Sequence, residues 1–324
     1  MASMDSTLRP MSTSQVLDRT FHLYRNHFPL FAGISALPPA ILLLEQISFI
    51  LLRFTAAPRL DFFLANAALV LGIIALVVGY LAAFAFATGA TVHAVSRVHL
   101  GQTATIRESY RVIRPLVWRI VRIVVTIAVR FTGALSAAVA VGLMPVFMMT
   151  SFGRTGPDPI VMWVAGLLIL VAVIVCVIWA IRLYCSYQLA VPVCVLERRG
   201  AVDCLKRSRF LSKGKAVQRI LLVLFLSAIL TYILSLVFSL PAIILAVVGA
   251  ADRTGRLILP ITLWQHLAGF FAGTIAGPIA TIALALLYYD ERVRKEAFDL
   301  QLMMETVGQQ TSQAAAAAAP TAIG

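Results

Sequence analysis

The chain has 324 residues, of which 60% are apolar and only 13% are charged, and its mean hydropathy is +0.92. These values lie far outside the usage of soluble domains, and several apolar runs exceed the ~18 residues that predict a membrane span. The composition therefore excludes an ordinary soluble domain and predicts an all-α polytopic membrane protein.

The net charge of +13 would favour a nucleic-acid partner if the chain were soluble. The positions of the charges argue against that partner. If the chain crosses the membrane six times, most of its 27 lysines and arginines fall on the side that holds both termini. The opposite side holds five: Arg53, Arg59, Arg154, Arg253 and Arg256. By the positive-inside rule both termini are predicted to be cytoplasmic, with the bilayer and its anionic phospholipids as partners and no nucleic acid.

The first part of the chain predicts an amphipathic helix followed by two spans. Residues 1–13 are polar, and we expect a flexible N-terminus there. An amphipathic helix is expected from Ser14, a suitable N-cap, because apolar side chains then recur at helical spacing. The first span is predicted over residues 29–52, with a kink at Pro38 and Pro39, and the second apolar run covers residues 62–95.

The second part repeats this order. An amphipathic helix from about Thr103 leads to a third span over residues 131–150, which Pro145 is expected to interrupt. The fourth run covers residues 160–196, and at 1.5 Å per residue it would reach roughly 55 Å, well beyond a ~30 Å hydrocarbon core. We expect its last turns to stand clear of the membrane and to form a packed collar with the amphipathic helices. A strong tilt or a break near Pro192 are the alternatives.

The third part begins with the basic amphipathic segment at residues 200–220 and continues into a fifth span, residues 220–250, and a sixth, residues 257–289. A closing helix is expected over residues 291–306, because apolar side chains recur there at helical spacing. The alanine-rich residues 307–324 are predicted to be a disordered tail.

Short columns of similar residues relate the segments that begin these three parts. Gly200, Leu205 and Ser208 align with Gly101, Ile106 and Ser109, and residues 16–28 fit the same columns. We therefore expect a six-span domain over residues 14–306, built from repeats at about 14–96, 101–197 and 200–290, each an amphipathic helix plus two spans.

A basic cluster on the third amphipathic segment is the first candidate site. It contains Lys206, Arg207, Arg209, Lys213 and Lys215. Such a cluster could hold anionic lipid headgroups, at roughly 1 kcal/mol per residue near the surface. The alternative is that it only fixes the topology.

Three charged residues next to or inside apolar runs are further candidates. Arg130 precedes the third span and Arg182 follows the apolar part of the fourth run, so both are expected at one depth near the inner boundary. They either extend toward water beside the lipid or face inward together as an anion site. Glu45 is the one acidic residue within an apolar run, and its position near the outer interface leaves its role open.

The sequence contains no recognisable catalytic constellation. There is no nucleophile with a base, no phosphate loop and no metal-binding motif, and the five histidines are scattered. The four cysteines are expected to be free thiols that act as small apolar residues. We predict no enzyme activity, no cofactor and no metal.

Three stretches carry a resemblance to a known family: residues 17–25 (LDRTFHLYR), residues 182–214 and residues 287–302 (LYYDERVRKEAFDLQL). They resemble the membrane domain of bacterial glycerophosphodiester phosphodiesterases, which is also found as a stand-alone, uncharacterised bacterial membrane protein. In the family this domain may precede a soluble catalytic barrel with metal-binding His, Glu and Asp residues. The present chain has no room for such a barrel, so the resemblance implies an accessory domain without phosphodiesterase activity.

The functional expectation is a non-enzymatic protein of the bacterial cytoplasmic (inner) membrane, a scaffold or accessory to envelope lipid and glycerophosphodiester metabolism, with a possible membrane-protein partner. The alternative is a small transporter or lipid exporter, suggested by the prolines within spans and by the internal symmetry. A membrane-embedded enzyme is a more distant third.

Overall fold

A computed structural model of the chain describes residues 11–55, 62–152, 159–249 and 257–317. These residues form helices joined by short connections, and they contain no strand. The predicted all-α class is therefore confirmed for the described part of the chain.

Five of these helices are long and apolar enough to cross a membrane, and the number rises to six if a bent pair of helices counts as one span. The bent pair is α2 (Phe28–Ser35) and α3 (Leu37–Thr55), whose axes differ by 43°. Pro38 and Pro39 lie at the start of α3, where the missing N–H groups and the proline rings prevent the helix from continuing straight. The structure thus agrees with a multi-pass membrane protein.

The first helix, α1 (Thr13–Asn26), begins two residues earlier than the sequence indicates. Its N-cap is Ser12 rather than Ser14, because the Ser12 hydroxyl accepts from the Gln15 backbone N–H while the Gln15 side chain accepts from the Ser12 backbone N–H. α2 and α3 follow, and then α4 (Phe62–His99).

The second amphipathic helix is α5 (Ile106–Ile113), which leads through a short 3-10 turn at Arg114–Leu116 into α6 (Val117–Phe152). α6 remains helical through Pro145, so the predicted interruption there is not observed. The helix α7 (Pro159–Tyr187) returns beside α6.

The fourth apolar run is broken. α7 ends at Tyr187, and the eight-residue α8 (Ala190–Glu197) starts after a turn at residues 188–189. Pro192 explains the position of the break, because it has no N–H to donate to the carbonyl of Gln188 and its ring would collide with that group. The interruption is small, since Trp163–Glu197 still counts as one candidate span of 35 residues, and residues 190–195 are all buried.

The last part consists of α9 (Ala201–Leu211), α10 (Lys215–Gly249) and α11 (Ile258–Ala317). α11 is one helix of 60 residues, about 90 Å long at the usual rise. It unites the sixth span with the predicted closing helix, and it continues through residues 307–317, where composition predicted a disordered tail. Residues 1–10 and 318–324 lie outside the described residues.

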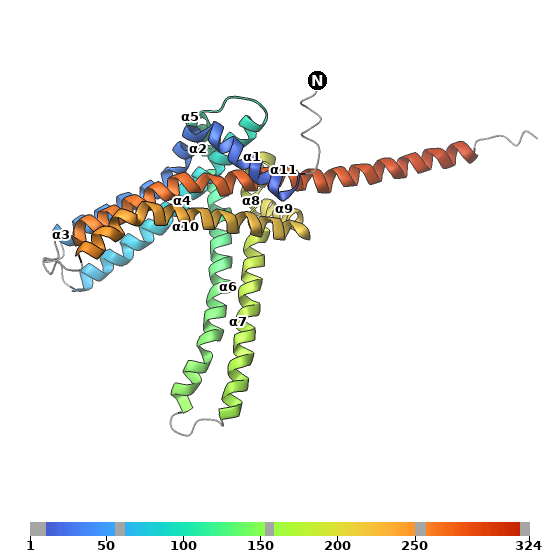
Figure 1. Cartoon of the computed structure of the whole chain (residues 1–324). Coiled ribbons are helices and arrows are strands. Elements are labelled where there is room, and N and C mark those ends of the chain that lie inside the picture. The colour runs from blue at the N-terminus through green and yellow to red at the C-terminus, as the bar shows by residue number, and fades with distance from the viewer. Residues whose placement is uncertain (1–10, 56–61, 153–158, 250–256, 318–324) are drawn as a thin grey trace, which may run out of the picture.

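The long helices form two groups (Figure 1). α3, α4, α10 and α11 pack along one another as a bundle, whereas α6 and α7 form a hairpin that projects from it at a steep angle. The two groups meet in a collar, which consists of α1, α2, α5, α8 and α9 with the adjoining ends of α4, α6 and α11. Because the hairpin stands apart from the bundle, the structure does not show three equivalent repeats.

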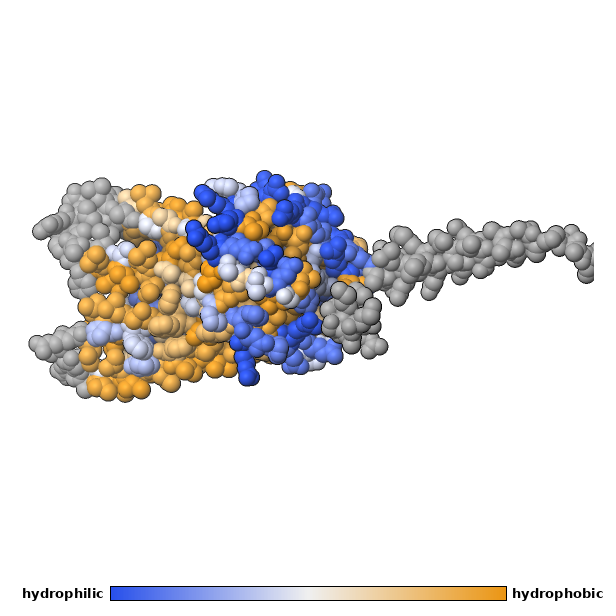
Figure 2. All heavy atoms as spheres, turned by 90° about the horizontal axis from the view of Figure 1, so that it is seen from above, coloured by the Kyte–Doolittle hydropathy of each residue, from blue (hydrophilic) through white to orange (hydrophobic). Residues whose placement is uncertain are grey.

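The collar and the bundle differ in surface chemistry. Hydrophilic side chains gather over the collar, while hydrophobic side chains cover the bundle (Figure 2). Within the bundle α11 is the central helix, since 56% of its most apolar 18-residue window is buried, against 11% for α4 and for α10. The apolar outer faces of both groups are those expected of helices that lipid surrounds.

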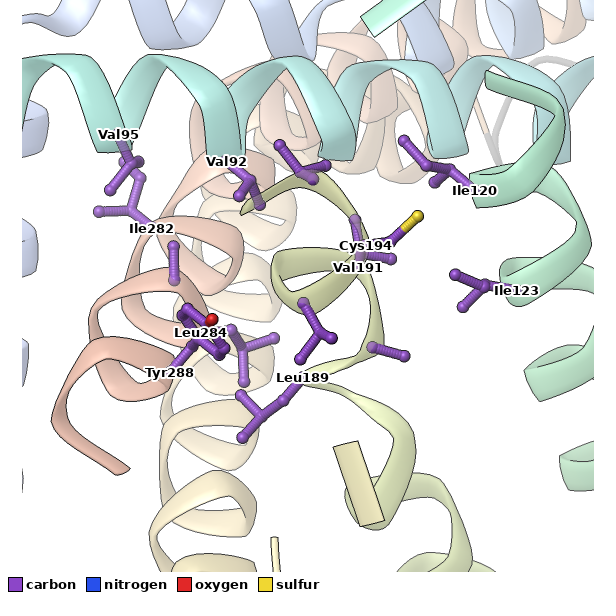
Figure 3. Packing of buried hydrophobic residues seen from close by; sticks show 14 of the residues in the cluster. Val92, Val95, Ile120, Ile123, Leu189, Val191, Cys194, Ile282, Leu284 and Tyr288 are labelled. Atoms are coloured by element: carbon purple, nitrogen blue, oxygen red, sulfur yellow. The ribbon is translucent and has the colours of Figure 1, made fainter. Parts of the chain in front are cut away.

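The main hydrophobic core lies inside the collar, with α8 at its centre. Leu189 and Val191 beside and within α8 face α4, α6 and α11 (Figure 3). Gly89 allows α4 to approach α6 closely, because a Cβ atom there would lie 2.7 Å from Cδ1 of Ile120. The collar thus packs against both the bundle and the hairpin and connects them.

Candidate anion-binding pocket

A pocket of about 550 Å³ lies where α7, α9 and the first turn of α10 meet. Its lining combines four cationic side chains with two serines and the turn between α9 and α10. The lining residues are Arg182, Ser186, Lys206, Arg209, Phe210, Ser212, Lys213, Gly214 and Val217.

The sequence of α9 directs its cations to the surface. The buried side of α9 consists of Ala201, Cys204, Leu205, Ser208 and Leu211, which recur at intervals of three and four residues. Lys206 and Arg209 therefore face outward. The Ser208 hydroxyl donates to the carbonyl of Ser186 over 2.8 Å, which fixes α9 against the end of α7.

Cys204 belongs to the apolar side of α9 and takes no part in the pocket. A hydrogen bond to the Cys194 thiol, together with burial, raises the pKa of Cys204. The thiol is fully buried and stays protonated at neutral pH, so it acts as a small core residue rather than a nucleophile.

A tight turn brings the end of α9 to the start of α10. Gly214 has φ +76, a left-handed conformation that favours glycine. From α11, the Lys295 ammonium donates to the carbonyls of Phe210, Leu211 and Lys213 at 3.1, 2.5 and 3.2 Å. This cation caps the last carbonyls of α9, which would otherwise lack partners.

The pocket carries uncompensated positive charge. Among the described residues, no carboxylate lies within ion-pair distance of Arg182, Lys206, Arg209 or Lys213. The first turn of α10, represented in the lining by Val217, adds the positive end of a helix dipole. The Ser212 hydroxyl is buried in the lining and has no hydrogen-bond partner among the described residues. The pocket thus offers donors and positive charge that an anion would satisfy.

Tyr187 joins the pocket to the base of the hairpin. Arg209 from α9 lies over its ring, 5.6 Å from the centroid. Arg130 from α6 donates to its hydroxyl over 2.5 Å and lies 5.2 Å from the same centroid. Tyr187 therefore contacts one cation of the pocket and one cation of the hairpin.

Two carboxylates of the collar pair with arginines near the pocket, whereas Asp203 on α9 is exposed and forms no ion pair with the described residues. Glu197 at the end of α8 forms an ion pair with Arg199 at 2.8 Å, and it accepts hydrogen bonds from Arg207 at 3.5 Å and from the Tyr288 hydroxyl at 2.9 Å. Arg207 also pairs with Glu296. This network leaves the other cations of α9 without an acidic partner.

A second buried network holds the N-terminal segment on α10 and α11. Asp290 accepts from Arg219 at 2.5 Å, from Arg294 at 2.9 Å and from the backbone N–H of Met11 at 2.6 Å. Arg219 also pairs with Glu291 at 2.7 Å. Because the Asp290 side chain is fully buried and each of its contacts is satisfied, this network stabilises the joint.

The pocket contains four of the basic residues that the sequence singled out. Arg182, Lys206, Arg209 and Lys213 come together there. Three other predicted residues do not line it: Arg207 pairs with Glu197, Lys215 is exposed at the start of α10, and Arg130 contacts Tyr187. Arg130 and Arg182 are thus both near the pocket, but only Arg182 contributes to its lining.

Glu45 lies half-buried on α3, and it takes part in no ion pair with the described residues. It is remote in sequence from the helices that form the pocket. The structure gives it no partner that would indicate a function.

Sequence reasoning missed the buried carboxylates Glu197, Asp290 and Glu291 and the serines of the pocket. A signal for the carboxylates was present, because adjacent acidic residues at the end of a long apolar run require partners when the helix continues. Ser212 gave no signal, since its burial depends on how α9 turns into α10.

The chemistry of the pocket is that of binding. It contains no histidine or carboxylate that could act as a base, and no three His, Cys, Asp or Glu side chains of the described chain come together as a metal site.

Comparisons of the chain with protein-family models, with curated proteins and with solved structures give no match.

Proposed function

We propose that the chain is a non-enzymatic integral protein of the bacterial inner membrane that binds anionic phospholipid headgroups through the pocket between α7, α9 and α10. It would act as a scaffold or accessory in envelope lipid metabolism. Four cations without acidic partners around one pocket are the observation that carries this proposal. The pocket is lined by the end of the apolar helix α7 and by the basic helix α9, a combination that favours a lipid headgroup as the anion.

Two finer features belong to the same proposal. The distribution of basic residues supports cytoplasmic termini, which would place the pocket at the inner leaflet. The order of an amphipathic helix followed by two long helices supports a common origin for the three parts, as in the membrane domain that the chain resembles.

The first experiment measures lipid binding to the purified full-length protein. A fluorescent phosphatidylglycerol is titrated against the wild type and against the double variant Arg182→Gln/Lys213→Gln. At about 1 kcal/mol per cation, the double variant should bind about 30-fold more weakly. Phosphatidylcholine with the same acyl chains should bind weakly to both.

Lys215→Gln is the control, because Lys215 directly follows Gly214 but does not line the pocket. It should weaken binding by less than about twofold. A loss of about fivefold, the effect of about 1 kcal/mol, would show a general attraction to basic residues rather than a pocket. Unchanged affinity in the double variant would overturn the proposal.

The accessory role has its own test, which is crosslinking in native membranes with deletion of the gene. Recovery of an enzyme of envelope lipid metabolism and an altered membrane lipid composition are expected. If no partner is recovered and the lipid composition is unchanged, the accessory role is wrong even where the pocket binds lipid.

A further inference from the structure

A second pocket, of about 220 Å³, lies within the bundle. Of the helices that line it, only α10 also lines the basic pocket. α2, α3, α4, α10 and α11 all contribute to it. The lining residues are Ser35, Pro38, Pro39, Leu42, Tyr80, Phe84, Ala87, Thr88, Thr91, Thr231, Gly269, Gly273, Gly277, Pro278 and Thr281.

Two backbone features create this space. At the 43° bend between α2 and α3, the rings of Pro38 and Pro39 form one wall. On α11, the absence of side chains at Gly269, Gly273 and Gly277 leaves room on the opposite wall. A Cβ atom at Gly273 would lie 3.3 Å from Pro39, whereas one at Gly269 would meet nothing within 4 Å.

Four of the six hydroxyl groups in the wall donate to backbone carbonyls, whereas those of Tyr80 and Thr281 have no hydrogen-bond partner among the described residues. Thr88, Thr91 and Thr231 each donate to the carbonyl four residues earlier in their own helix, at 2.6, 2.9 and 2.8 Å. The Ser35 hydroxyl donates to the carbonyls of Phe31 and Thr274. Because Thr88, Thr91 and Thr231 each use their one hydroxyl hydrogen in a bond to their own helix, the wall offers few free donors to a polar ligand.

The lining also contains no charged side chain. A wall of prolines, aromatic rings and glycines, in which four of the six hydroxyl groups already bond to the backbone, matches a hydrocarbon better than an ion or a charged headgroup. The volume is sufficient, since a dry apolar cavity of roughly 150 Å³ already holds a small hydrocarbon molecule.

The pocket is half-open, and its exposed members include Phe84, Thr231 and Gly269. These belong to three of the helices that are apolar enough to span a membrane. The medium at its opening is therefore lipid acyl chains, which supply the occupant directly.

We propose that this pocket is a binding site for one hydrocarbon chain of a membrane lipid, inserted between α3, α4 and α11. The site is independent of the basic pocket and would take the chain of a neutral lipid as well as that of an anionic one. It makes the bundle a lipid-binding unit in its own right.

The test uses a phosphatidylcholine with a photoreactive diazirine on one acyl chain, in nanodiscs that contain the full-length protein. After irradiation, attachment should be concentrated on the lining residues of α3 and α4, such as Leu42 and Phe84. Gly269→Leu should lower this attachment several-fold, because the new side chain occupies space that is now empty. Leucine also favours the helix over glycine, so the variant should fold.

Gly166→Leu on α7 is the matched control, since a Cβ atom there also meets nothing within 4 Å and Gly166 lines neither of the two pockets described above. It should leave the attachment unchanged. Attachment spread evenly over all exposed apolar residues, or attachment in Gly269→Leu equal to that of the wild type, would overturn the proposal.

The neutral headgroup of the probe separates this test from that of the basic pocket. The double variant Arg182→Gln/Lys213→Gln should label like the wild type. A joint loss of labelling in that variant would contradict the independence of the two sites.

Discussion

Asp290 shows how a single residue can hold distant parts of this chain together. Its carboxylate contacts α10 through Arg219, its own helix through Arg294 and the N-terminal segment through Met11. A buried charge is tolerated only where such partners compensate for the loss of water. The acidic residues of the collar can be buried because arginines pair with them, whereas the cations of the pocket have no acidic partner and stay near the surface.

Asp290→Asn should destabilise the protein by about 3 kcal/mol, because it leaves the largely buried Arg219 and the exposed Arg294 with less compensation. The measurement is the free energy of unfolding in mixed detergent micelles. The control is Glu108→Gln, which breaks the exposed pair between Glu108 and Arg97 at 3.3 Å and should cost less than about 1 kcal/mol. Similar losses in the two variants would contradict a stabilising role for the buried network.

At the scale of elements, the turn between α9 and α10 decides the geometry of the basic pocket. It sets the direction of α10 relative to α9 and places Lys213 beside the first turn of α10. Its conformation depends on Gly214, since other residues enter the left-handed region only at an energetic cost.

Gly214→Ala should therefore destabilise the protein by about 1 kcal/mol and weaken binding of phosphatidylglycerol. Steric collision is not the cause, because a Cβ atom at Gly214 meets nothing within 4 Å. Gly166→Ala, in the middle of α7, should instead stabilise by about 0.5–1 kcal/mol, since alanine favours a helix. A stabilising effect at Gly214 would show that the turn is not strained. Thermal unfolding in detergent measures both.

Elements were predictable from the sequence where one physical effect dominates. Apolar periodicity and length predicted the long helices, and Pro38 with Pro39 predicted the bend between α2 and α3. The interruption predicted at Pro145 is wrong, because a membrane helix can accommodate a proline without ending. The pocket was only partly predictable: the basic cluster marked α9, but the contribution of Arg182 depends on the break between α7 and α8.

At the scale of the whole molecule, the two groups of long helices point in different directions (Figure 1). Both groups contain helices that are apolar enough to cross a membrane. Membrane helices are tilted from the bilayer normal by about 20° on average and by at most about 40°. A flat bilayer therefore favours orientations in which the hairpin and the bundle are closer to parallel. The hairpin contacts the rest of the chain only near its base, so this change requires little repacking.

This argument predicts a distance change. Spin labels replace Leu143 near the tip of α6 and Val247 near the end of α10, both of which are exposed. The distance between them should be shorter in nanodiscs than in detergent micelles, since a micelle can adapt to divergent helices. A pair at Leu143 and Trp163, within the hairpin, should give the same distance in both. An unchanged 143–247 distance would mean that the divergence persists in a bilayer.

We expect Tyr187 to couple the orientation of the hairpin to the binding of an anion in the basic pocket. Its ring contacts Arg209 of the pocket, and its hydroxyl accepts from Arg130 of the hairpin. An anion that draws Arg209 from the ring changes the support of α6, so headgroup affinity and hairpin direction are linked. By reciprocity, a bilayer that reorients the hairpin changes the affinity for the anion by the same factor. Anionic lipid should accordingly shift the 143–247 distance distribution in the wild type and leave it unchanged in Arg209→Gln.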